Sequence, residues 1–293
     1  MPIPVQCAKP YRGHEIENGP LLVEDKLDGI RCGIVVSLKT GRARSYSRGG
    51  NLQRNMEAIL EEIEETLSRF NVRSGTRVLV DGEAYIDRSW RSASGLLRAQ
   101  NLKPKHYEAM ERLRLHVFDV VALNGGKNPV SQTPQNVRTA RVAHLFGACA
   151  HIIPVPSIEC RTAADVKRAY NAALERGREG VMLKQPAGIY RCAVRSSDWL
   201  KLKPFTTSDG RIIGFVEGNG RLCGTLGALR VRLKDGRSVR VGNGMCDAQR
   251  NHIWRSRRRL KGAWVEIRHQ KDKHEVAVCR FNSLVRIRGD RDW

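Results

Sequence analysis

The stretch that decides the fold is VEDKLDGIRCGIVV, residues 23–36. Its apolar positions on both sides of an Asp-Gly pair predict two strands joined by a turn at Asp28-Gly29. Lys26 lies in the first strand beside three carboxylates, and Arg31 follows in the second. Charged residues at a strand end are commonly just solvated, but a lysine in this position can also be a nucleophile. The rest of the chain decides between these two interpretations.

The composition indicates a folded and strongly basic protein. Of the 293 residues 41% are hydrophobic, which is enough for a core, and 52 Lys plus Arg against 30 Asp plus Glu give a net charge of +22. Such an excess favours a polyanionic partner, most often nucleic acid. No apolar run approaches the roughly 20 residues that cross a bilayer, and none suits a signal peptide. We therefore expect a soluble, cytoplasmic protein with no membrane partner.

The eight cysteines are scattered singly along the chain, without a C-x-x-C pair. This spacing argues against a zinc site and against a dense disulfide framework. We expect reduced, structural thiols, as is usual in a cytoplasm.

Periodicity predicts an α+β fold. Apolar residues at helical spacing predict a helix from Met56 to Phe70, and a capping box at Thr162 starts another helix that ends near Arg176. The first 22 residues resemble an arm or loop. Further strands are predicted at 77–86, 113–123, 179–184 and 199–203.

Beyond Pro204 the pattern changes to short strands separated by glycines, with helical signals only around 246–260. This pattern is typical of a small β-barrel. We place the linker near 204–209, which gives expected domains at 1–207 and 208–293. The basic cluster RSRRR at 255–259 is either a solvated helix face or a phosphate-binding patch, and the net charge favours the patch.

Seven short motifs follow one another in the chain, and each is rich in residues that bind nucleotides or metal ions. At average residue frequencies, a K-x-D-G-x-R match in a chain of this length has a chance on the order of one in three hundred. The order and chemistry of the other motifs strengthen the signal. The motifs are Lys26–Arg31 (K-x-D-G-x-R), Ser47–Gly50 (S-R-G-G), Asp81–Glu83 (D-G-E), Phe118-Asp119 (F-D), Glu179–Lys184 (E-G-V-M-L-K), Lys201–Lys203 (K-L-K) and Arg288–Arg291 (R-G-D-R).

These residue types suit the attack of an amine on a phosphate. Lysine attacks phosphorus only when it is neutral, and nearby cations such as Lys201 and Lys203 favour that form. The carboxylates next to Lys26 would oppose it, so we expect them to point elsewhere or to bind a metal. Phe118 can stack on a purine, although a phenylalanine in an apolar strand is usually part of a core. Cations suited to phosphates are Arg31, Arg48, Lys184, Lys201 and Lys203, and carboxylates suited to Mg²⁺ are Glu83 and Glu179.

The motif set resembles the covalent nucleotidyltransferases, which comprise ATP-dependent DNA ligases, RNA ligases and mRNA-capping enzymes. It is most similar to the small DNA ligases of bacteriophages, and SASGLLRA at 92–99 and DGRIIGFVEG at 209–218 also look like that group. The resemblance implies a nucleotidyltransferase domain of ATP-grasp-like antiparallel sheets with helices, followed by an OB-fold barrel. It implies a DNA ligase that uses ATP to seal 5′-phosphate/3′-hydroxyl breaks in duplex DNA through lysyl-AMP and adenylylated DNA.

The resemblance also implies roles for individual residues. Lys26 would carry AMP, Glu24 would recognise adenine and Phe118 would pack on it. The motif at Arg288 would orient pyrophosphate, although its last residue is arginine where the family has lysine. The other implied roles are the ribose for Arg31 and Glu83, the phosphates or nick for Arg48, the α-phosphate for Lys201 with Lys203, and the metal ion for Glu179. By their charge, Lys184 is suited to the phosphates and Glu83 to Mg²⁺ (or Mn²⁺).

The expected partner is nicked or broken double-stranded DNA, which a monomer would encircle with its two domains. Two other interpretations stay open. An RNA ligase or capping enzyme shares the core motifs, and a basic nucleic-acid-binding protein could keep the fold without activity. The preference among nicks, cohesive ends and blunt ends is not encoded in any recognisable pattern.

Overall fold

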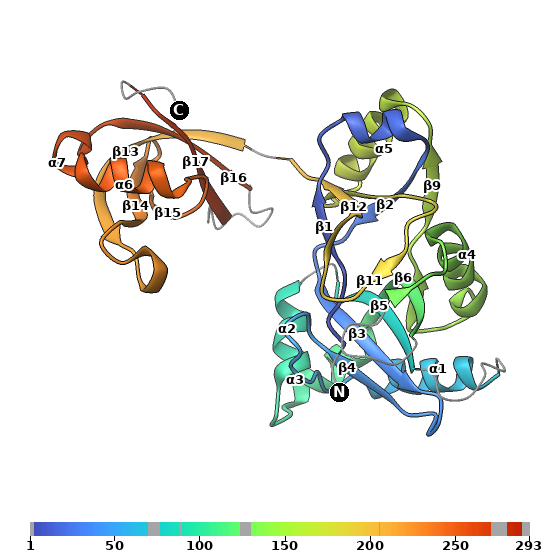
Figure 1. Ribbon diagram of the computed structural model, residues 1–293. Helices are drawn as coiled ribbons and strands as arrows, with labels where there is room; N and C mark the ends of the chain where they lie inside the picture. The colour runs from blue at the N-terminus through green and yellow to red at the C-terminus, as the bar shows by residue number, and fades with distance from the viewer. Residues whose placement is uncertain are drawn as a thin grey trace. The chain divides into compact units, whose positions relative to one another are not determined.

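The computed structural model of the chain describes residues 3–69, 77–87, 90–123, 130–204, 206–270 and 280–288. Two compact units make up the chain, Met1–Lys203 and Pro204–Trp293 (Figure 1). No described helix is both long enough and apolar enough to span a membrane. The described cysteines are all free thiols, and Cys279 lies outside the described residues.

Strands and helices alternate irregularly along the first unit. In chain order they are β1 (Cys7–Pro10), the 3₁₀ helix η1 (His14–Asn18), β2 (Leu21–Lys26), β3 (Ile30–Ser37), β4 (Ala43–Tyr46), α1 (Glu57–Ser68), β5 (Arg77–Tyr85), α2 (Trp90–Arg98), α3 (Pro104–Arg112), β6 (Arg114–Leu123), β7 (Val130–Ser131), α4 (Gln135–Phe146), β8 (Ile152–Pro154), β9 (Ser157–Cys160), α5 (Ala163–Glu175), β10 (Gly180–Lys184), β11 (Tyr190–Arg191) and β12 (Arg195–Leu202).

Two five-stranded sheets form the body of the first unit (Figure 1). The first sheet has the order β1-β12-β10-β2-β9, and the second has the order β4-β3-β5-β6-β8. Helix α5 packs on the outer face of the first sheet, and helices α1, α2 and α4 pack on the outer face of the second. A third apolar cluster, which includes Val35, Leu79 and Trp199, lies between the sheets. This arrangement is the expected α+β class.

Alternation along the strands decides which side chains face the space between the sheets. On β2, Val23 packs under α5, whereas Glu24 and Lys26 point to the opposite face. On β12, Leu200 joins the core under α5 while Trp199 faces the second sheet. The polar residues of several strands therefore gather between the two sheets.

The predicted turn at Asp28-Gly29 joins two different sheets and is not the turn of a hairpin. Strand β2 pairs with β10 and β9, whereas β3 pairs with β4 and β5. Gly29 approaches β5 so closely that a Cβ there would lie 2.7 Å from the Ala84 carbonyl oxygen. Glycine is needed here because any side chain would push β5 away. The predicted strands are correct, and the pairing that an Asp-Gly turn suggests is wrong.

The predicted helices are present. The first is α1, whose buried residues Ile59 and Ile63 follow the apolar spacing; Phe70, the predicted end, lies outside the described residues. The second is α5, where the Thr162 hydroxyl accepts a hydrogen bond of 3.1 Å from the Asp165 amide in a capping box. Helices α2, α3 and α4 are absent from the prediction.

The first 22 residues are more than an arm or loop, which corrects the prediction. Strand β1 pairs in parallel with β12, and β2 already begins at Leu21. Strand β1 has four residues and ends in Pro10, so it offers too little alternation to be recognised.

The second unit contains a five-stranded sheet with the order β15-β14-β13-β16-β17. The edge strands meet where Asn243 bridges to Ser283 and the Leu284 amide donates to the Asn243 carbonyl at 2.9 Å, so the sheet curls into a barrel. The predicted small barrel is confirmed. Its elements are β13 (Thr206–Glu217), the 3₁₀ helix η2 (Gly220–Leu222), β14 (Leu226–Leu233), β15 (Ser238–Val241), α6 (Asp247–Arg255), α7 (Arg257–Leu260), β16 (Trp264–Gln270) and β17 (Arg280–Ile287).

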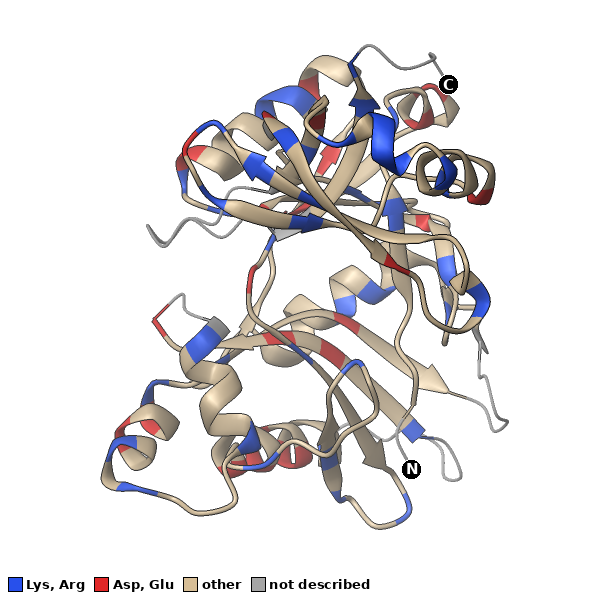
Figure 2. Cartoon of the chain, turned by 90° about the vertical axis from the view of Figure 1, so that its left-hand side faces the viewer, with Lys and Arg blue, Asp and Glu red and all other residues tan. Residues whose placement is uncertain are grey.

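Basic residues are distributed over both units. Figure 2 marks Lys and Arg on strands, loops and helices of each unit, among them the helical region α6–α7 of the second. In that region Arg255, Arg257, Arg258 and Arg259 are exposed, and Arg257 also lies over the Trp254 ring at 4.6 Å. The predicted basic cluster is therefore helical and presents at least three arginines to solvent.

Candidate active site

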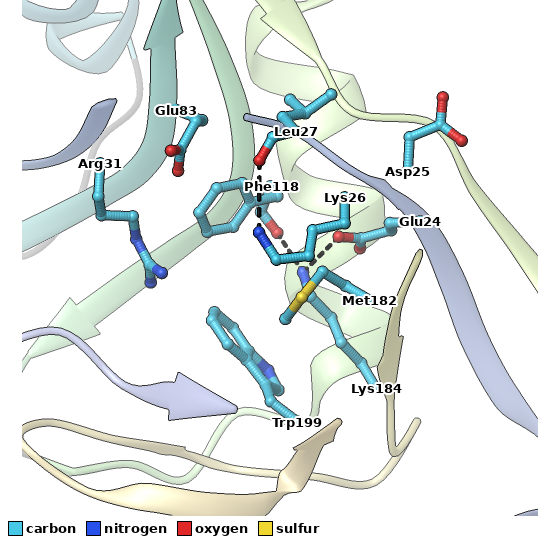
Figure 3. Close-up of a pocket in the computed structure, with 10 residues that line it drawn as sticks. All are labelled: Glu24, Asp25, Lys26, Leu27, Arg31, Glu83, Phe118, Met182, Lys184 and Trp199. Atoms are coloured by element: carbon cyan, nitrogen blue, oxygen red, sulfur yellow. Dashed lines mark hydrogen bonds and ion pairs between the residues drawn. The ribbon is translucent and has the colours of Figure 1, made fainter. Parts of the chain in front are cut away.

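A pocket opens between the two sheets of the first unit, and six of the predicted site residues line it (Figure 3). The walls come from β2 and β10 on one side, from β3, β5 and β6 on the other, and from β12. The lining residues are Glu24, Asp25, Lys26, Leu27, Arg31, Glu83, Phe118, Met182, Lys184 and Trp199.

Lys26 is held at the rim of the pocket by Glu179. One carboxylate oxygen of Glu179 pairs with the Lys26 amine and the other pairs with the Lys203 amine. Burial raises the pKa of Glu179, but the charges of Lys26 and Lys203 outweigh burial and the net shift is downward. The pKa of Lys203 is lowered by burial and then by the charge of Lys26, against the opposing effect of Glu179. The structure thus brings the predicted nucleophile, the metal candidate and one phosphate-binding lysine together.

Of the three carboxylates beside Lys26 in the sequence, Asp25 points elsewhere as expected, whereas Glu24 faces the same pocket as Lys26 and pairs with another lysine. Asp25 points away from the pocket and pairs with Arg176 at 2.7 Å and Arg178 at 3.1 Å (Figure 3). Glu24 pairs with Lys184, and Asp28 is exposed. The carboxylate that does contact Lys26 is that of Glu179, which directly precedes β10 and is 153 residues away in the chain.

Glu24 and Lys184 form a buried ion pair on the floor of the pocket. The two charged groups are 2.8 Å apart with side chains 1–2% exposed, and the Lys184 amine also donates to the Phe118 carbonyl at 2.8 Å. Burial raises the pKa of Glu24 to about 7 even though the Lys184 charge opposes the shift. The second oxygen of Glu24, Oε1, is buried and has no hydrogen-bond partner among the described residues. A buried acceptor of this kind can receive a hydrogen bond from a ligand.

Arg31 is fixed by a chain of buried groups. It makes a bidentate ion pair with Asp81, with both N–O distances at 2.5 Å, and the Tyr190 hydroxyl donates to the same carboxylate at 2.5 Å. Its guanidinium lies 4.8 Å from the centre of the Phe118 ring and 5.6 Å from that of Trp199. A bidentate arginine is geometrically well defined, so Arg31 is set in place before any ligand arrives.

Glu83 faces Arg31, Lys26 and Glu179 from the second sheet. Burial raises its pKa to about 7; Arg31 and Lys26 lower it, while Glu179 and Asp81 raise it further. Glu83 and Glu179 are therefore close enough for their charges to repel each other. Two carboxylates that repel in this way suit a divalent cation, and Mg²⁺ commonly uses one or two carboxylates together with substrate phosphates. In the described residues no group of three or more His, Cys, Asp and Glu could hold a metal by itself.

Two predicted cations lie beyond the pocket wall. Lys201 has a lowered pKa, caused first by burial and then by the charges of Lys203, Arg195, Lys26 and Arg48. Arg48 is exposed in the loop after β4. Both belong to a basic surface next to Lys26 but do not line the pocket itself.

Arg288 belongs to the second unit. There it pairs with Asp209 at 2.7 Å, with its side chain half exposed. The remaining residues of its motif, 289–291, lie outside the described residues. A role for Arg288 at the nucleotide therefore stays a prediction.

Four residues that line the pocket or fix its arginine have no role in the sequence-based prediction. Met182 and Trp199 line the pocket, and Asp81 and Tyr190 fix Arg31. Met182 and Asp81 stand within quoted motifs, and Trp199 stands two residues before K-L-K, so position in the sequence was a usable signal. Tyr190 carries no such signal, because its contact with Asp81 spans 109 residues.

Comparison with protein families gives two matches that together cover most of the chain. A family model described as the ATP dependent DNA ligase domain matches residues 6–203, and one described as the DNA ligase OB-like domain matches residues 217–288. The curated relatives include a DNA ligase of Methanothrix thermoacetophila, 30% identical over 250 residues, which are 79% of this chain and 42% of the relative. A probable DNA ligase of Streptomyces griseus is 30% identical over 245 residues, which are 78% and 46%. This chain thus spans less than half the length of these relatives.

Solved structures share the fold. The structure named Pmar-Lig_PreS3 matches with a TM-score of 0.79 and 28% identity, covering 99% of this chain and 69% of that chain. A structure from a study of Lig E DNA ligases matches with a TM-score of 0.71 and 21% identity, covering 98% and 100%. The ATP-dependent DNA ligase of bacteriophage T7, in complex with ATP, matches with a TM-score of 0.57 and 20% identity, covering 97% and 98%.

Proposed function

The chain belongs to the ATP-dependent DNA ligase family, and on this premise we propose that it seals 5′-phosphate/3′-hydroxyl breaks in duplex DNA with ATP. The proposal assigns nucleotide transfer to a domain of residues 1–207 and additional DNA contacts to an OB-fold domain of residues 208–293. The observation that carries it is the position of Lys26, whose amine lies between Glu179 and the pocket that Glu83, Arg31 and Phe118 line.

In the first step the Lys26 Nζ attacks the α-phosphorus of ATP. A P–N bond forms, the bond from that phosphorus to the bridging oxygen breaks, and pyrophosphate leaves. Because the Lys26 amine is paired with Glu179, this ion pair has to open before Nζ can reach the phosphorus. Lys203, the other partner of Glu179, would bind the phosphate as Lys26 turns toward it.

Recognition of the base rests on the floor of the pocket. The unpartnered Glu24 Oε1 can accept a hydrogen bond from an exocyclic amino group. Adenine carries such a group at C6, where guanine has a carbonyl instead. A carbonyl there would face a second acceptor, and a buried acceptor left unpaired costs about 1–3 kcal/mol. Phe118 offers a ring for stacking. The site is therefore expected to prefer ATP to GTP.

Glu83 and Glu179 would hold Mg²⁺ together with the phosphates. When bound, the ion neutralises charge on the phosphates and the leaving pyrophosphate. Glu179 lies beside the first sheet and Glu83 lies on the second, so the distance between the two carboxylates depends on the spacing of the sheets.

The later steps need DNA. The 5′-phosphate at a break displaces Lys26 from AMP, and the 3′-hydroxyl then attacks that phosphate and releases AMP. With a net charge of +22 the chain is suited to bind the phosphate backbone. Arg48, which is exposed, would contact the broken strand, whereas Lys201, which is half-buried, would bind the α-phosphate together with Lys203. We propose a monomer that closes around the duplex with both domains. The expected linker at 204–209 is shorter in the structure, because β12 ends at Leu202 and β13 begins at Thr206, and movement between steps would take place at this short connection.

The test is intact-mass measurement after incubation with ATP and Mg²⁺, followed by addition of nicked duplexes. We expect a mass increase of one AMP in the wild type and none in Lys26→Ala, with EDTA suppressing the increase. We also expect joining of nicked DNA to exceed joining of nicked RNA.

Three results would contradict the proposal. They are an AMP adduct that persists in Lys26→Ala, labelling by GTP alone, and joining of RNA alone. A wild-type protein that binds DNA but never forms an adduct would instead indicate a non-enzymatic binding protein.

A further inference from the structure

Arg178 joins the two sheets of the first unit beside the pocket. Its Nε donates to Asp25 Oδ2 at 3.1 Å, and its Nη1 donates to the Tyr85 hydroxyl at 3.3 Å. Asp25 belongs to β2 of the first sheet, and Tyr85 belongs to β5 of the second. The Arg178 side chain is only 24% exposed, so it bridges the sheets in a largely protected position.

Both ends of this bridge adjoin residues proposed to act on the nucleotide. Asp25 directly precedes Lys26, and Tyr85 follows Glu83 by two residues on the same strand. Arg178 itself directly precedes Glu179, whose backbone amide donates to the Lys26 carbonyl at 3.0 Å. A change in the bridge would therefore move Lys26 and Glu179 relative to Glu83.

The Tyr85 end is rigid. Its ring is 7% exposed and stacks on the His116 ring, with centroids 4.5 Å apart and an angle of 10° between the planes. His116 has its pKa lowered to about 4, first by burial and then by the charge of Arg178, so this stack contains a neutral imidazole near pH 7. A hydroxyl on a buried, stacked ring is a fixed point from which Arg178 can position Asp25.

Arg176 provides a natural comparison. It pairs with the other oxygen of Asp25 at 2.7 Å, but its side chain is 55% exposed. Among the described residues, the ion-pair partner of Arg176 is Asp25, which lies on the first sheet. Removing Arg176 would therefore delete one cation beside Asp25 and leave the link to the second sheet intact.

We propose that Arg178 is a positioning residue that holds Lys26 and Glu179 in register with Glu83, by bridging Asp25 on one sheet to Tyr85 on the other. The inference rests on the proposed ligase function. Arginine is suited to the task because its planar fork donates in two fixed directions at once, which the single ammonium of lysine does not do. The bridge contacts none of the reacting atoms, so it is expected to affect chemistry more than nucleotide binding.

The experiment measures the rate of AMP transfer to Lys26 over a range of ATP concentrations in Arg178→Gln, Tyr85→Phe, the double variant and Arg176→Gln. For Arg178→Gln the rate at saturating ATP should fall about tenfold while the half-saturating ATP concentration changes less than about twofold. Tyr85→Phe keeps the stacked ring and should lower the rate about threefold. The rate of the double variant should match that of Arg178→Gln within about twofold, because both substitutions break the same bridge. Arg176→Gln should stay within about twofold of the wild type.

The inference is overturned if Arg178→Gln behaves like Arg176→Gln, if its defect lies in ATP affinity alone, or if the losses of the two single variants multiply in the double variant. Tyr85→Phe guards against a folding artefact, since its melting temperature should stay close to that of the wild type. A wild-type protein that forms no adduct in this assay would overturn the proposed function and this inference with it. A labelled wild type with a fully active Arg178→Gln would overturn the inference alone.

Discussion

Glu179 contacts Lys26 in two ways: its carboxylate pairs with the Lys26 amine, and its backbone amide donates to the Lys26 carbonyl at 3.0 Å. Lys26 and Glu179 are therefore held next to each other by the pairing of β2 with β10. This explains how a lysine surrounded by acids in the sequence is controlled by an acid that is remote in the sequence. The same carboxylate also holds Lys203, so its removal should affect the whole cationic end of the site.

Glu179→Gln keeps the shape of the side chain and removes its charge. We expect the rate of AMP transfer to fall by about 10² and the Mg²⁺ concentration needed for half-maximal rate to rise, because a metal-binding charge near the phosphates is lost. Quench measurements of the adduct over a Mg²⁺ series check this. Glu57→Gln, at an exposed position in the first turn of α1, is the control and should have no effect. A normal Mg²⁺ dependence in Glu179→Gln would argue against metal binding by this residue.

Glu83 should make stability depend on pH. Its folded pKa of about 7 lies above the ordinary value of 4.5, so the folded state binds more protons than the unfolded state between these two values. The stability that Glu83 contributes is therefore fully present below about pH 4.5 and is lost as the pH rises through 7. Relative to the wild type, Glu83→Gln should remove a slope of up to about 1.4 kcal/mol per pH unit in this window.

Urea titrations at pH 5, 6, 7 and 8 measure this difference in the free energy of unfolding. The exposed Glu108→Gln serves as the control and should leave the slope unchanged. Parallel curves for Glu83→Gln and the wild type would refute the raised pKa.

The ion pair between Arg138 and Asp119 should be essential to the fold of the first unit. Both side chains are 0% exposed at 2.8 Å, and Arg138 also donates to the Gly188 carbonyl at 3.1 Å. Arg138→Met would leave a buried carboxylate unpaired and should cost about 3–5 kcal/mol of unfolding free energy. Arg112→Met breaks a pair with Asp87 that is more than half exposed, and should cost at most about 1 kcal/mol.

Urea unfolding of the two variants gives the comparison. The double variant Arg138→Met/Asp119→Leu should recover part of the loss, since it leaves no charge behind. Equal costs for Arg138→Met and Arg112→Met would show that burial of the pair is not the deciding factor.

The basic cluster on α6 and α7 should bind DNA phosphates. Arg255, Arg258 and Arg259 are exposed, and replacing all three by Gln should lower the slope of log affinity against log salt for nicked duplex DNA by about 2.7. Fluorescence anisotropy over a salt series measures the slope. The control replaces three arginines of the first unit that already pair with carboxylates, namely Arg69, Arg112 and Arg161. Equal changes in slope in the two triple variants would show that only total charge matters.

Much of the site could be predicted because strands impose a period of two and the motifs mark which residues matter. Glu24, Lys26, Arg31, Glu83, Phe118 and Lys184 line one pocket, and in the predicted strand at 199–203 Leu200 and Leu202 pack in the core while Lys201 and Lys203 alternate with them. Local patterns also predicted α1, α5 and the barrel, because each has a strong apolar repeat or turn signal.

The remainder depends on contacts between distant segments. The crossing at Asp28-Gly29 and the Tyr190–Asp81 hydrogen bond are decided by which strands pair, and no local pattern encodes that pairing. Helix α3 has no buried residue, so it offers no apolar stripe to recognise. The ion-pair partner of Arg288 is also remote in the sequence, because Asp209 lies 79 residues away.

The crossing between residues 26 and 31 also has a mechanical consequence. Five residues of backbone reach at most about 18 Å, so the two walls of the pocket are tied together at this end by covalent bonds. A second crossing lies nearby, because β8 of the second sheet continues into β9 of the first through residues 155–156, and Ser157 pairs with Glu24. If the walls separate to admit a nucleotide, these two crossings limit the motion at this end, and the widest displacement falls at the far end of the strands. Lys26 then lies where the walls move least, so the chain can open without carrying the Lys26 amine far from the pocket.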